Sequence, residues 1–138
     1  MFRIVKEFEV KLTFEDFVEL SDSMAPRLFT IASHAKTQKN VIVVASLVEN
    51  GLISKFFLEK PRSIRAELRK STFTDAMKWK KVIFIAAGTG FAPFRGFLQE
   101  KVYNMKQNAS APIVTLFFGC KHETGDFICK DEILGWRD

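Results

Sequence analysis

The chain has 138 residues, 47% of them hydrophobic and 27% charged, and its formal net charge at pH 7 is +5. A chain of this size and hydrophobicity can bury a core, which excludes a disordered protein and allows one ordinary domain or two small ones. No apolar run is long enough to span a membrane and the charged N-terminus does not resemble a signal peptide, so we expect a soluble, cytoplasmic protein.

The N-terminal residues predict a strand followed by a short helix. Residues 2–12 alternate apolar and charged side chains, which is typical of a half-exposed strand. Thr13 resembles an N-cap, because the acidic Asp16 follows three positions later, and it predicts an amphipathic helix through about residue 22. Residues 27–33 then read as a strand that ends in a polar loop.

Two more strands and a helix are predicted before the middle of the chain. Residues 41–48 are apolar enough for a central strand. A helix begins near Leu52 and cannot continue through Pro61. Residues 63–73 predict an antiparallel strand, and the Lys-rich connection at 74–80 is the expected domain boundary.

The second half opens with a strand, a tight glycine turn and a helix. Residues 82–86 are unbroken apolar and predict a fully buried strand, followed by Gly-Thr-Gly at 88–90. Apolar residues from Phe94 to Val102 recur at helical spacing with polar residues between them, and Pro93 fits the first helical turn. Glycines let backbone amides approach a pyrophosphate, and a helix N-terminus stabilises its charge.

A second buried strand is predicted at residues 112–118. It ends in Gly119 and Cys120, which a parallel pairing would place beside the glycine turn, at the edge where open α/β sheets bind ligands. Residues 127–136 predict a final helix with a charged face that includes Glu132. The glycine turn alone does not settle the function, because Pro93 replaces the third glycine of the dinucleotide fingerprint and such turns occur in other α/β domains.

A longer string of residues carries a family resemblance. Residues 88–100 (GTGFAPFRGFLQE), followed by residues 117–122 (FFGCKH) and Asp126-Phe127, resemble the NADPH-binding half of the ferredoxin–NADP reductase superfamily. They are most similar to its diflavin reductase branch, which includes the NADPH–cytochrome, sulfite and methionine-synthase reductases. The resemblance implies a mixed α+β and α/β fold: a partial antiparallel FAD-binding β-barrel at 1–76, then a truncated parallel Rossmann-like NADP-binding βαβ unit at 77–138.

The resemblance also implies an FAD site. Arg27 would neutralise the flavin pyrophosphate, Phe29 would lie against the isoalloxazine ring, and Thr30 would face the ring's reactive edge. Phe29 replaces the family's usual Tyr, which keeps the stacking area, loses a phenolic hydrogen bond and predicts weaker flavin affinity. The implied FAD-binding residues are Arg27, Phe29, Thr30, Ser33, Gly51 and Ser54.

The implied NADPH site lies at the glycine turn and the second strand. The implied residues are Gly88, Thr89, Gly90, Pro93, Gly119 and Cys120. Cys120 would lie beside the nicotinamide and, with Thr30, would be catalytic; the alternative for Cys120 is a small buried residue at a strand end. Cys129 is expected to serve packing, His34 and His122 are expected at the surface, and no metal site is predicted.

The function implied by the resemblance is electron transfer from NADPH through FAD to an acceptor. One alternative is a catalytically degenerate reductase-like fragment that acts as a structural subunit or interaction module, and another is a nucleotide-binding module without flavin. The resemblance covers only a shortened middle portion of the family's architecture, and a two-stranded sheet with apolar faces and open edges is a poor independent fold. We therefore expect a homo-oligomer or a larger assembly, with an electron-acceptor protein as a possible partner and no nucleic acid.

Overall fold

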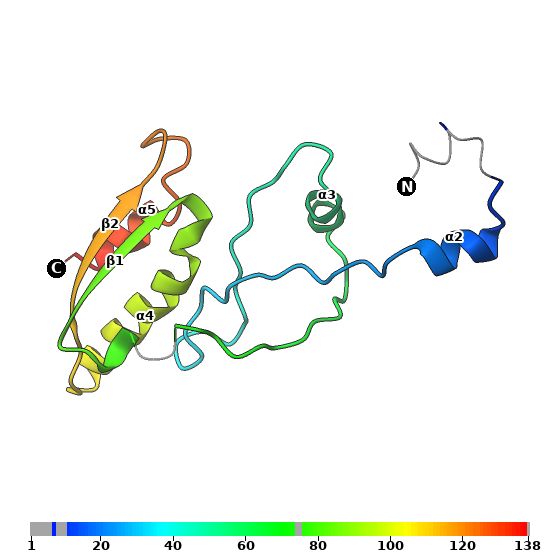
Figure 1. Ribbon diagram of the computed structural model, residues 1–138. Helices are drawn as coiled ribbons and strands as arrows, with labels where there is room; N and C mark the ends of the chain where they lie inside the picture. The colour runs from blue at the N-terminus through cyan, green and yellow to red at the C-terminus, as the bar shows by residue number, and fades with distance from the viewer. Residues whose placement is uncertain (1–6, 8–10, 74–75, 138) are drawn as a thin grey trace.

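A computed structural model describes residue 7 and residues 11–73 and 76–137 of the chain. Figure 1 shows a packed α/β unit in the second half, and long extended loops with the short helices α2 and α3 in the first half. The elements in chain order are α2 (Phe14–Leu20), α3 (Leu52–Leu58), the 3₁₀ helix η1 (Ala76–Lys78), β1 (Lys81–Ala87), the 3₁₀ helix η2 (Gly88–Phe91), α4 (Ala92–Lys106), β2 (Ile113–Gly119) and α5 (Lys130–Gly135).

The packed unit is built on one parallel strand pair, as the sequence predicts. β1 and β2 pair in parallel from Lys81↔Ile113 to Ala87↔Gly119. Helix α4 follows the glycine turn η2 directly and connects the two strands. The carboxyl ends of both strands therefore lie together at the edge from which α4 starts, which is the arrangement of a βαβ unit.

The core lies on one face of this sheet. Phe84 and Ala86 of β1 are buried together with Leu98 of α4 and Phe91, whose side chain is 0% exposed. The Phe84 ring stacks on Phe94 with centroids 4.6 Å apart. Side chains from the C-terminal segment complete the cluster: Ile128, Cys129, Ile133 and Trp136.

The prediction of a fully buried first strand is wrong for its second face. Ile83 and Ile85 of β1 are 66% and 74% exposed, and Ile113 and Phe117 of β2 are exposed as well. Successive side chains of a strand point to opposite faces, and the cluster to which α4 and α5 contribute occupies only one of them. The apolar run therefore forms a sheet that is covered on one face.

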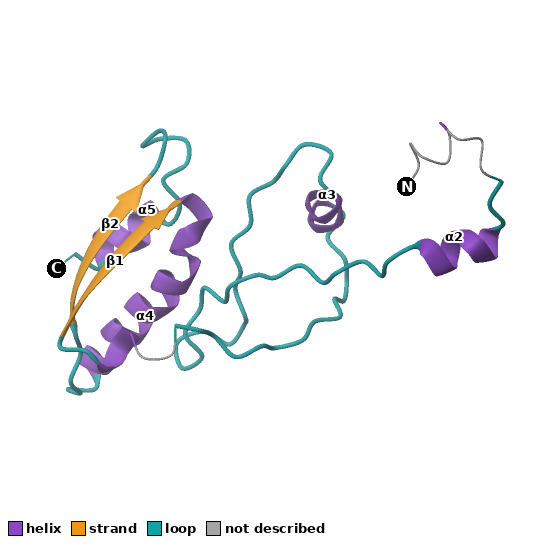
Figure 2. Cartoon of the chain, in the orientation of Figure 1, coloured by secondary structure: helices purple, strands orange, loops and turns teal. Residues whose placement is uncertain are grey.

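The predicted strands of the β-barrel do not form in the described residues (Figure 2). Residues 27–33, 41–48 and 63–73 are extended coil, apart from a single antiparallel bridge between Ile31 and Val43. The physical reason is the lack of neighbours: a strand requires ladder hydrogen bonds along its edges, and these runs find only one such contact. The strand predicted at residues 2–12 lies mostly outside the described residues.

The predicted helices in the first half are confirmed. Thr13 caps α2 through a capping box, in which its hydroxyl accepts from the Asp16 amide at 3.1 Å and Asp16 Oδ2 accepts from the Thr13 amide at 2.9 Å. Helix α3 ends at Leu58, before Pro61. Among the described helices, none has the length and apolar character that crossing a bilayer requires.

The last helix starts later than predicted. α5 begins at Lys130 instead of residue 127, because Cys129 has the left-handed backbone conformation, with φ of 54°. A residue in this conformation cannot belong to a right-handed helix. Ile128, Ile133 and Trp136 still reach the core, as expected.

We predict that Phe91→Ala destabilises the packed unit by about 3–5 kcal/mol, because the substitution leaves a cavity at a fully buried aromatic position. Urea denaturation followed by tryptophan fluorescence measures the change. Phe14→Ala is the matched control, since Phe14 is 76% exposed on α2 and its removal should change stability by less than about 0.5 kcal/mol. Equal effects of the two substitutions would contradict the assignment of the core.

Candidate functional site

The glycine turn forms an open helix start. Gly88 has a φ of +48°, which favours glycine, and a Cβ built on Gly88 or Gly90 would meet no heavy atom within 4 Å among the described residues. No side chain of the described residues caps the start of η2 or of the 15-residue helix α4. Uncapped amides at the positive end of a helix dipole form an environment that suits a phosphate.

The second strand brings Gly119 and Cys120 to the same edge. The register pairs Gly119 with Ala87, the residue directly before Gly88. Cys120 follows immediately and is exposed, so it is not the small buried residue of the alternative interpretation. The predicted NADPH residues Gly88, Thr89, Gly90, Pro93, Gly119 and Cys120 thus belong to one edge of the sheet.

A groove of about 520 Å³ lies between α4 and the extended first half of the chain. Arg27, Phe29, Thr30 and Ser33 line one side of it, and α4 contributes Pro93, Gly96, Phe97 and Glu100. Residues 67–73 form a further part of the wall. Four of the predicted FAD residues therefore share a groove with Pro93, one helical turn after the glycine turn.

Gly51 and Ser54 do not line this groove. Ser54 is buried at the start of α3, and its hydroxyl accepts a hydrogen bond from the Val48 amide at 2.8 Å. A Cβ on Gly51 would lie 3.0 Å from Ser54 Oγ and 3.1 Å from the Val48 carbonyl oxygen, so a side chain there would crowd the turn. We call residues 27–35 the groove segment, since most of them line the groove. Helix α3 contacts this segment through Phe57, whose ring lies edge-on to Phe29 at 5.6 Å.

Helix α4 is fastened to the groove segment by polar residues that the sequence pattern did not single out. Arg95 donates from Nη1 to the Ala32 carbonyl oxygen at 2.7 Å, and from Nε and Nη2 to the two carboxylate oxygens of Glu132 at 2.6 Å. The hydrogen bond with Glu132 raises the pKa of Arg95 and keeps it charged. Gln99 Oε1 accepts from the His34 amide at 3.0 Å.

A sequence signal for these contacts exists, although polar residues between apolar positions normally indicate a solvent-facing helix surface. Arg95 and Gln99 are four residues apart and so lie on one face of the helix, next to Gly96. A Cβ on Gly96 would lie 3.7 Å from the backbone of Ser33. The spacing is consistent with a docking face for another segment of backbone.

His34 is placed differently from the expectation of a surface histidine. Its ring lies 5.6 Å from that of Tyr103, and it lines the groove next to Ser33. Its Nδ1 atom is buried and finds no hydrogen-bond partner within the described residues. The groove thus has one unsatisfied polar atom in its wall.

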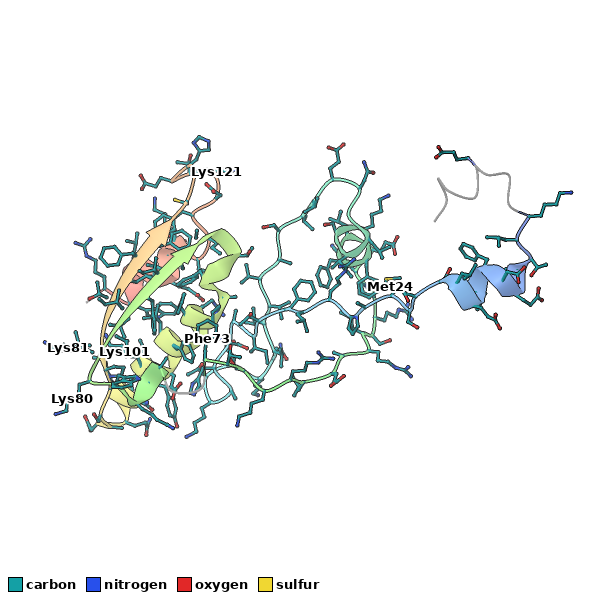
Figure 3. All side chains as sticks on the ribbon, viewed as in Figure 1. Met24, Phe73, Lys80, Lys81, Lys101 and Lys121 are labelled. Carbon is teal, nitrogen blue, oxygen red and sulfur yellow. The ribbon has the colours of Figure 1, made fainter. Side chains whose placement is uncertain are left out.

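The loop after β2 is held by one carboxylate. Asp126 accepts hydrogen bonds from the amides of Lys121 at 2.9 Å and His122 at 2.6 Å, which lower the pKa of this carboxyl group. Figure 3 shows Lys121 beside the end of β2, while Lys80, Lys81 and Lys101 lie around the opposite end of the sheet. Asp126 therefore fixes the backbone that follows Cys120 at the candidate phosphate-binding edge.

Comparison with known proteins gives a consistent set of matches. Residues 84–138 match the family model described as an oxidoreductase NAD-binding domain. The chain is 33% identical over 135 residues to the NADPH–cytochrome P450 reductase of Drosophila melanogaster. This match covers 86% of the chain and 20% of the reductase. It is 27% identical over 143 residues to NADPH-dependent diflavin oxidoreductase 1 of Arabidopsis thaliana. This match covers 93% of the chain and 23% of the oxidoreductase. The chain spans about a fifth of the length of these relatives.

The two cysteines are predicted to differ in thiol reactivity. Burial, and next the nearby Glu132 carboxylate, raise the pKa of Cys129, whereas Cys120 is exposed. We expect Cys129→Ser, which leaves Cys120, to react with a disulfide reagent at least about tenfold faster than Cys120→Ser. Absorbance of the released thiolate gives both rates, and equal rates in the native proteins would contradict the difference in environment.

The Asp126 turn is predicted to weaken in acid. A carboxyl group with a lowered pKa in the folded state stabilises the fold above its ordinary pKa, and this contribution is lost as the pH falls through the lowered value. We expect protection of the Lys121 and His122 amides from hydrogen exchange to fall between about pH 5 and pH 2 in the native sequence. In Asp126→Asn it should already be low at neutral pH. Asp22→Asn, in the coil after α2, is the control, and an unchanged pH profile in Asp126→Asn would show that the carboxylate does not hold the turn.

Proposed function

Because the chain belongs to the diflavin reductase branch of the ferredoxin–NADP reductase superfamily, we propose that it is part of an FAD-dependent NADPH oxidoreductase and contributes to both cofactor sites. The observation that carries the proposal is the shared groove, in which the Arg27–Ser33 segment faces the first turns of α4. In this proposal residues 1–76 belong to the flavin-binding part and residues 77–138 to the nucleotide-binding part.

The glycine-turn edge fits a dinucleotide pyrophosphate. The left-handed Gly88, the open space around Gly90 and the start of η2, which no side chain of the described residues caps, give a phosphate access to backbone amides of the turn. Cys120 is exposed beside this edge, where in our proposal it contacts the nicotinamide. The names of the relatives, which are NADPH-dependent reductases, support this nucleotide over others.

The groove fits a flavin by size and by the chemistry of its wall. Its volume of about 520 Å³ lies in the range of small-molecule sites. Arg27 supplies a cation for a phosphate, Phe29 an aromatic face for a planar ring, and Thr30 a hydroxyl for a polar edge. When bound, FAD would accept a hydride and release single electrons to an acceptor.

In this proposal the remaining predicted FAD residues, Gly51 and Ser54, support the groove wall. Gly51 and Ser54 shape the turn before α3, and Phe57 of that helix packs on the edge of Phe29. They would orient the aromatic ring from behind without contacting the flavin. The electron acceptor is proposed to be a protein, by analogy with the relatives named as reductases of cytochrome P450.

The proposal is tested with the purified chain and added FAD. We expect quenching of FAD fluorescence on binding, and bleaching of the flavin absorption band when NADPH is added without oxygen. A chain that takes up no FAD would contradict the flavin part of the proposal. Binding without bleaching would contradict the reductase activity and favour the non-catalytic alternative of an interaction module.

Arg27→Gln provides the matched substitution for this assay. Loss of one charge-assisted hydrogen bond to a phosphate costs about 1.5–3 kcal/mol, so the dissociation constant for FAD should rise roughly tenfold to hundredfold. Arg62→Gln removes the same charge from an exposed position outside the groove and should leave the affinity unchanged. Equal FAD affinities of the two variants would show that Arg27 does not bind FAD.

A further inference from the structure

A small set of contacts joins the two sides of the groove, which are α4 and the groove segment. Arg95 bonds to the Ala32 carbonyl oxygen and Gln99 accepts from the His34 amide, and a Cβ added at Gly96 would lie 3.7 Å from the Ser33 backbone. One face of α4 thus lies along three consecutive residues of the groove segment, 32–34. Arg95 itself does not line the groove.

The Arg95 contact has a chemistry that other side chains cannot reproduce. The residue is 7% exposed, and Ala32 is 0% exposed. Its guanidinium gives two donors to the Glu132 carboxylate on one side and a third to the Ala32 carbonyl on the other. A planar group with five N–H donors can satisfy both partners at once, whereas a lysine ammonium is a single point and cannot span them.

We propose that Arg95 is a positioning residue, which fixes the backbone at Ala32 and thereby sets how Phe29 and Thr30 face α4 across the groove. Thr30 is only two residues from Ala32. Among the described residues this segment is also restrained by the bridge between Ile31 and Val43, by the Ala32 amide, which donates to the Ile42 carbonyl oxygen at 2.7 Å, and by hydrogen bonds of the Ser33 hydroxyl to the backbone of residues 40 and 42. Glu132 in turn holds the guanidinium in place from α5. The part of this inference that concerns flavin binding rests on the proposed function.

Arg95→Lys separates positioning from general stability, because lysine keeps the charge beside Glu132 and loses the bond to Ala32. We expect the dissociation constant for FAD to rise about tenfold, together with a changed visible circular dichroism of the bound flavin. Amide exchange should accelerate at Ala32 and His34, whereas β1, β2 and the buried positions of α4 keep their protection. Glu132→Gln is the comparison variant, which retains the Arg95–Ala32 bond and should have a smaller effect on FAD affinity.

The outcomes separate this inference from the proposed function. If the native chain binds no FAD, the proposed function fails, and the exchange rates at Ala32 and His34 still decide whether Arg95 fixes this segment. If the native chain binds FAD and Arg95→Lys binds it equally well with the same flavin spectrum, the positioning role is overturned while the proposed function stands. A uniform loss of protection across β1, β2 and α4 also overturns it, because Arg95 would then be a general stabilising residue.

Discussion

The Arg95 guanidinium connects three segments that are distant in the sequence. It joins α4 to α5 through Glu132 and to the extended first half of the chain through the Ala32 carbonyl oxygen. The Arg95 side chain is buried, whereas the Glu132 side chain is 40% exposed. The desolvation of Arg95 offsets much of the attraction in such a pair, and in our proposal its role is to specify one arrangement of the three segments. The first half forms hydrogen bonds of its own, such as that from the Ala32 amide to the Ile42 carbonyl oxygen, and in our proposal its placement against α4 depends on Arg95 and Gln99.

The packed unit and the groove segment represent two levels of order. Phe84, Phe91 and Leu98 form a core under one face of a two-stranded sheet, and this core fixes the glycine turn at the sheet edge. The segments around the groove are instead extended chain with exposed apolar side chains, such as Leu28 and Leu68. Precise local geometry at the edge therefore accompanies a groove whose shape is set by a few long-range contacts.

This division places the two proposed cofactor sites in different physical settings. The proposed dinucleotide site is built from backbone features, namely a left-handed glycine and a 3₁₀ turn that no side chain of the described residues caps, which follow from local sequence. The flavin groove is built from side chains on segments more than 60 residues apart, as the bonds from α4 to Ala32 and His34 illustrate. Helix α4 belongs to both, since Pro93 stands in its first turn and lines the groove.

The sequence by itself determined the parallel strand pair, the glycine turn, the capping box at Thr13 and the end of α3 before Pro61, because periodicity, caps and proline act through neighbouring residues. It also carried the family resemblance and candidate residues such as Arg27 and Cys120. Only the tertiary structure decided that one face of β1 is exposed and that, among the described residues, the predicted barrel strands pair only through the Ile31–Val43 bridge. It also decided that Arg95 and Gln99 are buried and bond to the segment at Ala32 and His34. Pairing and burial depend on what another part of the chain places opposite a residue, and a local pattern contains no information about that neighbour.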